Sequence, residues 1–313
     1  MGASGAAEVK PRKLAGAACL IALGATAAWA AKPLFRLEKV IGADLCNVSA
    51  SQKCEGGFNA PRGLSLDSAG NLYVIESKNN RLCKFDSEGR FLKAWGKFMV
   101  SNSCGVDSQN NVWVIDMLNT YKFSGDGGEL AKWPRNKGAG QADIVHVGRV
   151  TNRVYSTKCR LEIYDNAMAE QGIKYDIPPG YCVWGLGEDR QGSLSCLMLL
   201  KTRGKSGNAA IFKFYKDGAY LNRWDFKMQE LNGPEAIAVD GAGTMYLCNT
   251  GNHNVTVLNA NGDILGSFGS KGAKDEQFYT PRGICVNPDG NIVFVADTGN
   301  HKVKKWVLET PGK

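Results

Sequence analysis

Few residues in this 313-residue sequence have the types and spacing that catalysis requires. The sequence contains three histidines, His146, His253 and His301, and no two of its ten cysteines have Cys-x-x-Cys spacing. A protein zinc site needs three or four nitrogen, sulfur or carboxylate ligands. No nucleophile elbow, P-loop or dinucleotide-binding fingerprint appears. The sequence therefore predicts no cofactor and no bound metal, and it favours binding over catalysis.

Three carboxylates, Glu76, Asp116 and Asp297, end apolar runs at corresponding places, and they could be interpreted as a catalytic ring. Each is followed by a polar turn, whose backbone N–H groups such side chains commonly accept as hydrogen-bond donors. Arg81 or Lys302 follows as a candidate ion-pair partner. We therefore interpret these carboxylates as turn-stabilising groups.

The elements that position these residues are short apolar runs. Residues 58–96 contain four of them, at 63–66, 71–75, 81–85 and 90–95, separated by clusters of Gly, Asn, Asp and Ser. Runs of this length and composition are typical of antiparallel strands joined by hairpins. No segment of this unit has the 3.6-residue periodicity of a helix.

The unit recurs along the chain. The residue that ends its first run is, in successive copies, Asp67, Asp107, Gly148, Glu188, Asp240 and Asn287, at steps of 40, 41, 40, 52 and 47 residues. Four strands in each period of 40–50 residues indicate the blades of a β-propeller. The predicted blades are 58–96, 99–134, 141–178, 179–226, 233–269 and 278–307, with fourth strands at 91–96, 130–134, 173–178, 220–225 and 264–269.

The sixth copy stops after its third strand, and only residues 309–313 follow. Residues 35–42 match residues 89–96 in pattern, so we predict that the segment 34–42 supplies the missing strand. Closing the ring in this way removes an exposed sheet edge. The predicted fold is all-β: a six-bladed propeller of four-stranded antiparallel blades, closed by the N-terminal strand and spanning residues 31–313 as one domain.

The copies resemble NHL repeats, which are named for an Asn-His-Leu-like triplet at the second hairpin. The corresponding triplets are Asn79-Asn80-Arg81, Asn252-His253-Asn254 and Asn300-His301-Lys302. The repeat pattern is cleanest in residues 278–306, and the resemblance extends over residues 33–307, weakly in the third and fourth blades. It implies a six-bladed β-propeller.

Residues 1–30 have the pattern of a signal peptide. Lys10, Arg12 and Lys13 precede an apolar run at 14–30, which ends in the small-x-small site Ala28-Trp-Ala30. This pattern predicts cleavage near Ala30 and a periplasmic or extracellular protein with no remaining membrane span. The alternative is an uncleaved membrane anchor, for which the run is short. Cleavage lowers the net charge from +8 to +6, because three cations and one acid are lost.

Export makes disulfides permissible. Cys46 and Cys54 flank a polar loop, and we predict a disulfide between them. Cys83, Cys159, Cys248 and Cys285 lie within strand-like runs, where a free cysteine usually behaves as a small buried hydrophobe. Nine cysteines remain after cleavage, so at least one thiol is free.

In this topology, the loops between blades and those between second and third strands emerge on one face. The positions aligned with Arg62 should surround the mouth of the central channel there. These positions are Asn102, Asp143, Val183, Glu235 and Arg282. Two basic segments should lie on the same face. They are the loop of Lys132, Arg135 and Lys137 around Trp133, and the insertion at 201–208 with Lys201, Arg203 and Lys205. Such a surface either binds anionic groups or is merely solvated.

We therefore predict an exported, monomeric binding or scaffold module for a protein or an anionic polymer or glycan. Export disfavours nucleic acid as a partner. The alternative is a metal-dependent lyase or lactonase-like hydrolase at the channel mouth. Lyases of similar fold hold zinc through Pro-His-Gly motifs, but the matching positions Arg62, Glu235 and Arg282 are not His. Asp143, Glu235 and Asn102 could imitate a lactonase calcium site. His146 is expected to face the channel opposite Cys285.

Overall fold

The computed structural model describes residues 35–42, 58–135, 144–157, 161–202 and 205–309, with only the backbone for 201–202 and 205–207. The described residues belong to one compact unit. No helix within these ranges is both long and apolar enough to cross a membrane. The predicted signal peptide, the Cys46–Cys54 disulfide, Asp143 and Arg203 lie outside the described residues.

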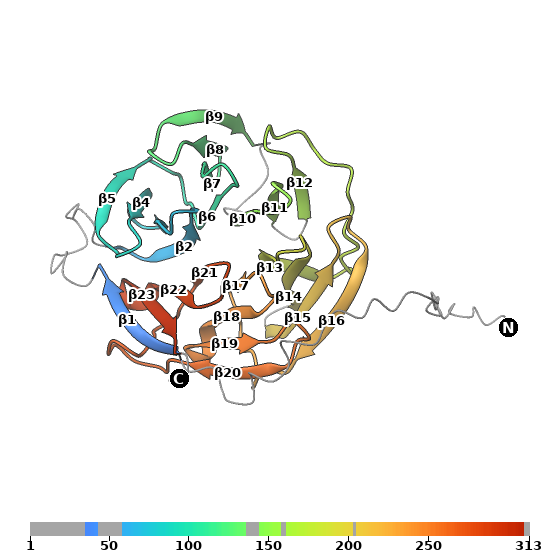
Figure 1. The fold of residues 1–313 in the computed structure, drawn as a ribbon. Helices are drawn as coiled ribbons and strands as arrows, with labels where there is room; N and C mark the ends of the chain where they lie inside the picture. Colours follow the sequence, from blue (N-terminus) through green and yellow to red (C-terminus); the bar gives the residue numbers. More distant parts are fainter. Residues whose placement is uncertain (1–34, 43–57, 136–143, 158–160, 203–204, 310–313) are drawn as a thin grey trace. The chain divides into compact units, whose positions relative to one another are not determined.

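Six antiparallel sheets are arranged around a central axis, and successive sheets follow one another along the chain (Figure 1). Blades 1 and 2 contain β2 (Pro61–Leu66), β3 (Leu72–Glu76), β4 (Arg81–Phe85), β5 (Phe91–Trp95), β6 (Ser103–Val106), β7 (Val112–Ile115), β8 (Asn119–Phe123) and β9 (Glu129–Pro134). Blades 3 and 4 contain β10 (Ile144–Val147), β11 (Val154–Thr157), β12 (Leu161–Tyr164), β13 (Tyr181–Glu188), β14 (Leu194–Thr202), β15 (Lys205–Phe214) and β16 (Tyr220–Phe226). Blades 5 and 6 contain β17 (Ala236–Val239), β18 (Met245–Asn249), β19 (Asn254–Leu258), β20 (Ile264–Phe268), β21 (Gly283–Val286), β22 (Ile292–Asp297) and β23 (Lys302–Leu308).

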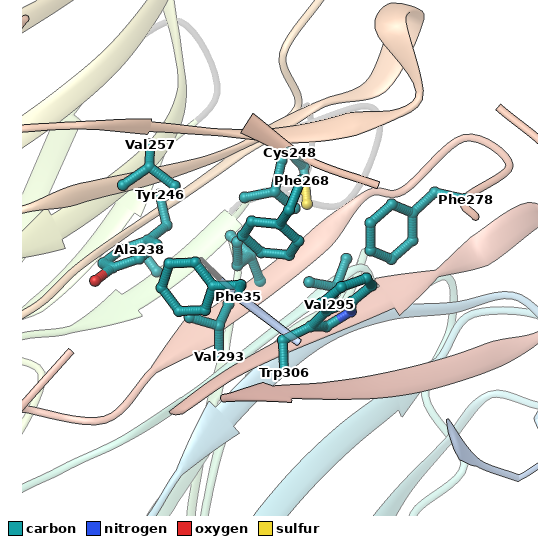
Figure 2. Close-up of a cluster of buried hydrophobic side chains, with 12 residues drawn as sticks. Phe35, Ala238, Tyr246, Cys248, Val257, Phe268, Phe278, Val293, Val295 and Trp306 are labelled. Atoms are coloured by element: carbon teal, nitrogen blue, oxygen red, sulfur yellow. The ribbon is translucent and has the colours of Figure 1, made fainter. Parts of the chain in front are cut away.

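The predicted ring closure is confirmed. The N-terminal strand β1 (Phe35–Ile41) pairs antiparallel with β23 and becomes the outermost strand of blade 6, next to blade 1 (Figure 1). Phe35 pairs with Leu308 and Ile41 with Val303. The Phe35 ring lies beside Phe268, with ring centroids 4.9 Å apart, in a buried cluster shared by blades 5 and 6 (Figure 2). Both chain ends therefore contribute to one sheet.

Blade 3 departs from the predicted four strands. Its sheet has three, β10, β11 and β12, and the expected fourth strand at 173–178 is not formed. This segment runs into Pro178 and Pro179, which have no N–H to donate to a ladder. Its apolar side chains still have a place in the core, because Ile173, Tyr175 and Ile177 pack in the hydrophobic cluster between blades 3 and 4.

Blade 4 begins with a β-bulge that shifts the repeat by one residue. The register of β13 against β14 changes between Val183 and Gly185. As a result Asp189, not the predicted Glu188, closes the first hairpin. Asp189 Oδ1 accepts hydrogen bonds from the N–H groups of Gln191 and Ser193 at 3.0 and 2.9 Å. Asp67 makes the equivalent pair of bonds in blade 1.

Glu188, which does not close the hairpin of its own blade, forms hydrogen bonds with the neighbouring blade 3. Its carboxylate accepts hydrogen bonds from the N–H of Val150 at 2.8 Å and of Thr151 at 3.3 Å, in the first hairpin of blade 3. That hairpin has Gly148 where other blades have a carboxylate or amide side chain. Blade 4 thus supplies the acceptor that blade 3 lacks.

The insertion in blade 4 extends a hairpin. The segment 201–208 was predicted to be a loop, but β14 extends to Thr202 and β15 begins at Lys205, with Lys201 opposite Ser206 and Thr202 opposite Lys205. The described residues of this segment therefore belong to the ladder.

The carboxylates that end the second strands are structural, as predicted. Asp116 accepts the predicted N–H groups of the following turn, from Leu118 and Asn119, whereas the backbone N–H groups bound by Glu76 and Asp297 come from the loop that enters the blade. Glu76 accepts a hydrogen bond from Asn59 N–H at 3.1 Å, Asp116 from Met99 N–H at 2.9 Å, and Asp297 from Tyr279 N–H at 2.7 Å. One expected ion pair differs. Asp297 pairs with the fully buried Lys304 at 2.7 Å, whereas Lys302 lies 3.5 Å from Asp275.

The histidines of the repeat triplets connect each blade to the next. His253 Nδ1 accepts the N–H of Thr280 in blade 6, and His301 Nδ1 accepts the N–H of Ala60 in blade 1, both at 3.0 Å. Each histidine has a left-handed backbone, with φ of 56° and 58°, after a short 3-10 turn, η1 (Thr250–Asn252) or η2 (Thr298–Asn300). This geometry explains the triplet in structural terms, without a metal or catalytic role for either histidine.

Candidate binding site at the channel mouth

We call the face that carries the interblade loops and the loops between second and third strands the mouth face. The opposite face, where the first and third hairpins of each blade turn, is the turn face. Four of the predicted site residues lie where the innermost strands begin, at the mouth face. Arg62 is in β2, and Asn102, Glu235 and Arg282 lie just before β6, β17 and β21. The antiparallel order of the strands places all four at one end of the channel.

These four side chains form two contacting pairs. Arg62 Nη1 donates to Asn102 Oδ1 at 3.2 Å, and Arg282 Nη1 donates to Glu235 Oε2 at 2.6 Å. The Glu235 and Arg282 side chains are 21% and 29% exposed, so their pair is largely removed from water. The predicted arrangement of polar residues at the mouth is therefore present for these four positions.

The electrostatics link the two pairs. Burial raises the pKa of Glu235, while Arg282 and Arg62 both oppose that rise. The pKa of Arg62 is lowered by burial and by the like charge of Arg282, with Glu235 acting in the opposite direction. Two guanidinium groups thus share one carboxylate, which leaves an excess of positive charge. Guanidinium groups bind carboxylate and phosphate groups in a bidentate geometry, so the mouth suits an anionic group.

Blade 4 contributes a different side chain from the one predicted. The bulge in β13 places Val183 in the core at 4% exposure, whereas the following Trp184 is 40% exposed. A strict alignment of the repeats could not find Trp184, because the extra residue of the bulge is invisible in the spacing. Trp184 lies within β13, at the position that the bulge aligns with Arg62, and an exposed tryptophan there is an expected contact residue for a partner.

Exposed apolar side chains accompany Trp184 on the mouth face. They belong to interblade loops, to loops between second and third strands, and to the ends of strands on that side. They are Met99, Val100, Leu118, Leu200, Met228 and Tyr279, with exposures between 36% and 52%. Several exposed apolar side chains on one face are a feature of surfaces that contact another protein.

The predicted fourth strand at 130–134 is confirmed as β9, and Lys132 and Trp133 of the first predicted basic loop lie in it. Lys137 lies outside the described residues. Trp133 lies in β9 and stacks on Trp113, with ring centroids 5.5 Å apart and an interplanar angle of 6°. Lys132 Nζ lies 5.2 Å from the centre of the Tyr121 ring. Arg135 donates to the Asp116 carbonyl at 2.9 Å. These cations are held against blade 2, so the predicted loop is not a free cationic surface. The ligand-binding role of Lys201, Arg203 and Lys205 stays a prediction.

The described cysteines follow the expectation for buried thiols. Cys83, Cys248 and Cys285 are free and at most 9% exposed. Cys182 is disulfide-bonded, which the sequence analysis did not predict, and the other five described cysteines are free. Cys182 stands directly before the bulge of β13, and no spacing motif marks it.

Within the described ranges, no three His, Cys, Asp or Glu side chains are grouped so as to hold a metal ion. Asp143, which with Glu235 and Asn102 could imitate a lactonase calcium site, lies outside those ranges. His146 and Cys285 do line one channel cavity, as expected.

Comparison with known proteins agrees with this geometry. The NHL repeat family model matches residues 58–85 and 278–306. NHL repeat-containing protein 2 of Bos taurus is 23% identical over 302 residues, which cover 82% of this chain and 40% of that protein. Its Gallus gallus counterpart is 32% identical over 122 residues, 36% of this chain and 16% of that protein. The chain thus spans at most 40% of the length of these two relatives.

Solved structures share the fold at low identity. A streptogramin B lyase superposes with a TM-score of 0.60 and 16% identity, covering 91% of this chain and all of that chain. A gluconolactonase from Xanthomonas campestris superposes with a TM-score of 0.62 and 14% identity, covering 88% of this chain and 98% of that chain. The six sheets and these superpositions define a six-bladed β-propeller. The chain is an NHL-type propeller, with matched NHL repeats in its first and sixth blades.

Proposed function

We propose that this NHL-type propeller is an exported binding module whose mouth face engages a protein partner. The observation that carries the proposal is the convergence of Arg62 and Arg282 on the single carboxylate of Glu235. The excess positive charge suits an acidic side chain of the partner. The surrounding apolar residues, Trp184 above all, supply the kind of hydrophobic contact area that is found in protein–protein interfaces.

Two observations support export. The first is the signal-peptide pattern of residues 1–30. The second is the disulfide at Cys182, because structural disulfides persist mainly in oxidising compartments. A periplasmic or extracellular location also removes most nucleic acid partners from reach.

Selection from a random peptide library with the purified chain tests the proposed partner chemistry. We expect enriched peptides to contain Asp or Glu next to aromatic or aliphatic residues. Arg62→Gln or Arg282→Gln should weaken their binding at least tenfold, since the acidic group loses its partner. Arg90→Gln is the matched control, because Arg90 is exposed on the turn face and paired with Asp86.

Peptides without acidic residues, or peptides whose binding is indifferent to both arginine variants, would contradict the proposal. A panel of anionic glycans provides the comparison. Arginine-dependent binding of a glycan, with no acidic peptide enriched, would assign the mouth to carbohydrate instead of protein.

One observation favours an enzyme as a second candidate. Glu235 is a partly buried carboxylate with a raised pKa at the channel mouth, as a general acid or base would be. The ion pair with Arg282 gives it an equally good structural role. Elemental analysis of the purified chain for zinc and calcium, repeated on Glu235→Gln, tests this candidate. A stoichiometric metal that Glu235→Gln loses would support it.

A further inference from the structure

The channel contains a cavity toward the turn face, away from the arginine pairs of the mouth. Its volume is about 210 Å³, and residues of all six innermost strands line it. The walls are mainly aliphatic and include Leu64, Leu186, Ile237 and Ile284. At the turn face the cavity is bordered by Val150, which is 53% exposed, and Arg190, whose side chain is 68% exposed.

Arg149 brings a positive charge into this cavity. Its guanidinium reaches across from blade 3 and donates to the Leu66 carbonyl of blade 1. Burial lowers the pKa of Arg149, which expresses the cost of holding a cation away from water. A guanidinium has five N–H groups to satisfy, and one carbonyl satisfies only one of them.

No carboxylate among the described residues lies within ion-pairing distance of Arg149. Asp67 acts on it through space, but both Asp67 oxygens are already occupied. Oδ1 accepts the N–H groups of Ala69 and Asn71, and Oδ2 accepts the Tyr73 hydroxyl.

Glu188 and Asp189 also line the cavity, but Glu188 accepts the Val150 and Thr151 N–H groups and Asp189 pairs with Lys213 at 3.1 Å. Arg149 is half-buried and has no ion pair with any described residue, so its guanidinium is the group that an anion in the cavity would contact.

The sequence marks this position once the shift in blade 4 is taken into account. Each first strand is followed by an anchor residue, which is Asp67 in blade 1 and Asp189 in blade 4. The residue that follows this anchor is small or neutral in four blades and arginine in the other two. In chain order it is Ser68, Ser108, Arg149, Arg190, Gly241 and Pro288. With Glu188 as the anchor of blade 4, the pattern is hidden, because Asp189 then takes the place of Arg190.

His146 adds a second unsatisfied group to the same cavity wall. Its Nε2 is sealed from water and has no hydrogen-bond partner. Burial, with a contribution from the Arg149 charge, lowers the pKa of His146 to about 4. The imidazole is therefore neutral at physiological pH, so Arg149 and the more exposed Arg190 are the cations that face an incoming anion.

We infer that this cavity binds a small monocarboxylate with a short apolar body, its carboxylate on Arg149 and its chain against the aliphatic walls. Inorganic anions would use the charge but not the walls. The volume equals that of about seven water molecules, so a ligand of roughly seven heavy atoms fits. The site is separate from the mouth face and does not depend on the function proposed there.

Isothermal titration calorimetry on the purified full chain tests the inference with valerate as the probe. We expect one saturable site for valerate and binding at least tenfold weaker for pentanamide, its neutral counterpart. Affinity should rise about fourfold per methylene from acetate to valerate, as burial of CH₂ groups predicts. Equal binding of the amide, or no dependence on chain length, would overturn the inference.

The Arg149→Gln variant locates the site. We expect it to bind valerate at least tenfold more weakly, while Arg90→Gln binds like the wild type. Unchanged binding by a folded Arg149→Gln variant would also overturn the inference. Should Arg149→Gln fail to fold, the affinities of the wild type for valerate, pentanamide and inorganic phosphate still test whether the site binds an apolar monocarboxylate. Phosphate binding as tightly as valerate would reject the apolar ligand class.

Discussion

The carboxylate oxygens of Glu188 lie 2.7 and 2.8 Å from the point where a Cβ on Gly148 would stand. Blade 3 lost the side chain that normally closes its first hairpin, and the neighbouring carboxylate occupies the vacated space. Glu188 then accepts the Val150 and Thr151 N–H groups of that hairpin. The two departures from the repeat compensate each other across a blade boundary.

This relationship predicts coupling between the two positions. Glu188→Ala should lose about 1–2 kcal/mol, because two N–H groups lose a charged acceptor. Gly148→Ala should lose about 1–3 kcal/mol, because the methyl group would meet Thr151 Oγ1 at 2.5 Å as well as the Glu188 carboxylate. The double variant should lose at least about 1 kcal/mol less than the sum of the two. Urea unfolding of the four proteins measures this. Strict additivity would show that the two residues do not compete for one space.

Much of the fold was predictable because the strands and turns of each repeat are determined by residues close together in the sequence. Apolar runs of four to six residues and Gly, Asn and Asp turns specify hairpins locally. The match between residues 35–42 and 89–96 was enough to place β1 beside β23. The carboxylates Glu76 and Asp116 could be assigned a structural role from the turns that follow them.

The errors arose where spacing alone could not settle the register. The bulge of β13 adds one residue that has no compositional signature, so Glu188 and Val183 were each assigned to the wrong role. Trp133 was assigned both to the fourth strand at 130–134 and to a basic loop; the strand is confirmed as β9, and Trp133 stacks on Trp113. The mouth pairs were predictable as neighbours from the alignment. Arg149 follows Gly148 and was left without a role, and Arg190 takes the equivalent position in blade 4 only when Asp189 closes the first hairpin.

The buried pair of Lys304 and Asp297 should be among the most sensitive contacts of blade 6. Both side chains are inaccessible to solvent, and Lys304 Nζ also donates to the carbonyls of Lys274 and Gln277. Lys304→Met leaves a buried carboxylate without its cation and should cost about 3–5 kcal/mol. Chemical denaturation measures the loss. Lys302→Met is the control, since its exposed pair with Asp275 should cost less than about 1 kcal/mol. Equal losses would refute a special role for the buried pair.

Arg282→Gln should destabilise the protein in a pH-dependent way. Burial already raises the pKa of Glu235, and removal of Arg282 should raise it further. A carboxylic acid whose pKa is raised on folding contributes stability below its unfolded value, and loses it as the pH rises through the folded value. The variant should therefore lose about 1–2 kcal/mol at pH 7.5, between the costs of exposed and buried pairs, and less at pH 4.

Denaturation at both pH values checks this expectation. Arg223→Gln is the control, because its pair with Asp225 on the outer strand of blade 4 is more exposed. A loss from Arg282→Gln that is the same at pH 7.5 and pH 4 would mean that Glu235 does not respond to Arg282.

Acid should weaken the fold through two histidines. The pKa of His146 is lowered to about 4 by burial, and that of His253 is also lowered, first by burial and then by Lys271. A histidine with a depressed folded pKa contributes stability above its unfolded value, near 6.5. That contribution is lost as the pH falls toward the folded value. Each such proton gives a slope of at most about 1.4 kcal/mol per pH unit.

Thermal or urea denaturation between pH 7.5 and pH 4 measures the slope. His146→Gln should flatten it, because glutamine fills a similar space and does not titrate. Arg36→Gln, an exposed change, should leave the slope unchanged. An identical slope in His146→Gln and the wild type would remove His146 from the acid response.

Phe35 should determine how firmly the ring is closed. The β1 strand is joined to the rest of blade 6 through its pairing with β23, the packing of its inward side chains and an ion pair between Glu38 and Lys305. Phe35→Ala removes a ring whose centroid lies 4.9 Å from that of Phe268 and 5.9 Å from that of Tyr246. The substitution should lower the free energy of unfolding by about 3–4 kcal/mol. Arg36→Ala is the neighbouring control. Its side chain is 59% exposed, and it should cost less than about 0.5 kcal/mol.

Hydrogen exchange separates a local from a global effect of Phe35→Ala. If β1 closes the ring, the amides of β23 that pair with it should exchange faster in the variant, because their partner strand is released more often. Amides of β7 in blade 2, which do not contact β1, should change only as much as global stability does. Loss of protection confined to β1, with β23 unaffected and stability close to that of Arg36→Ala, would show that the N-terminal strand covers the edge without closing it.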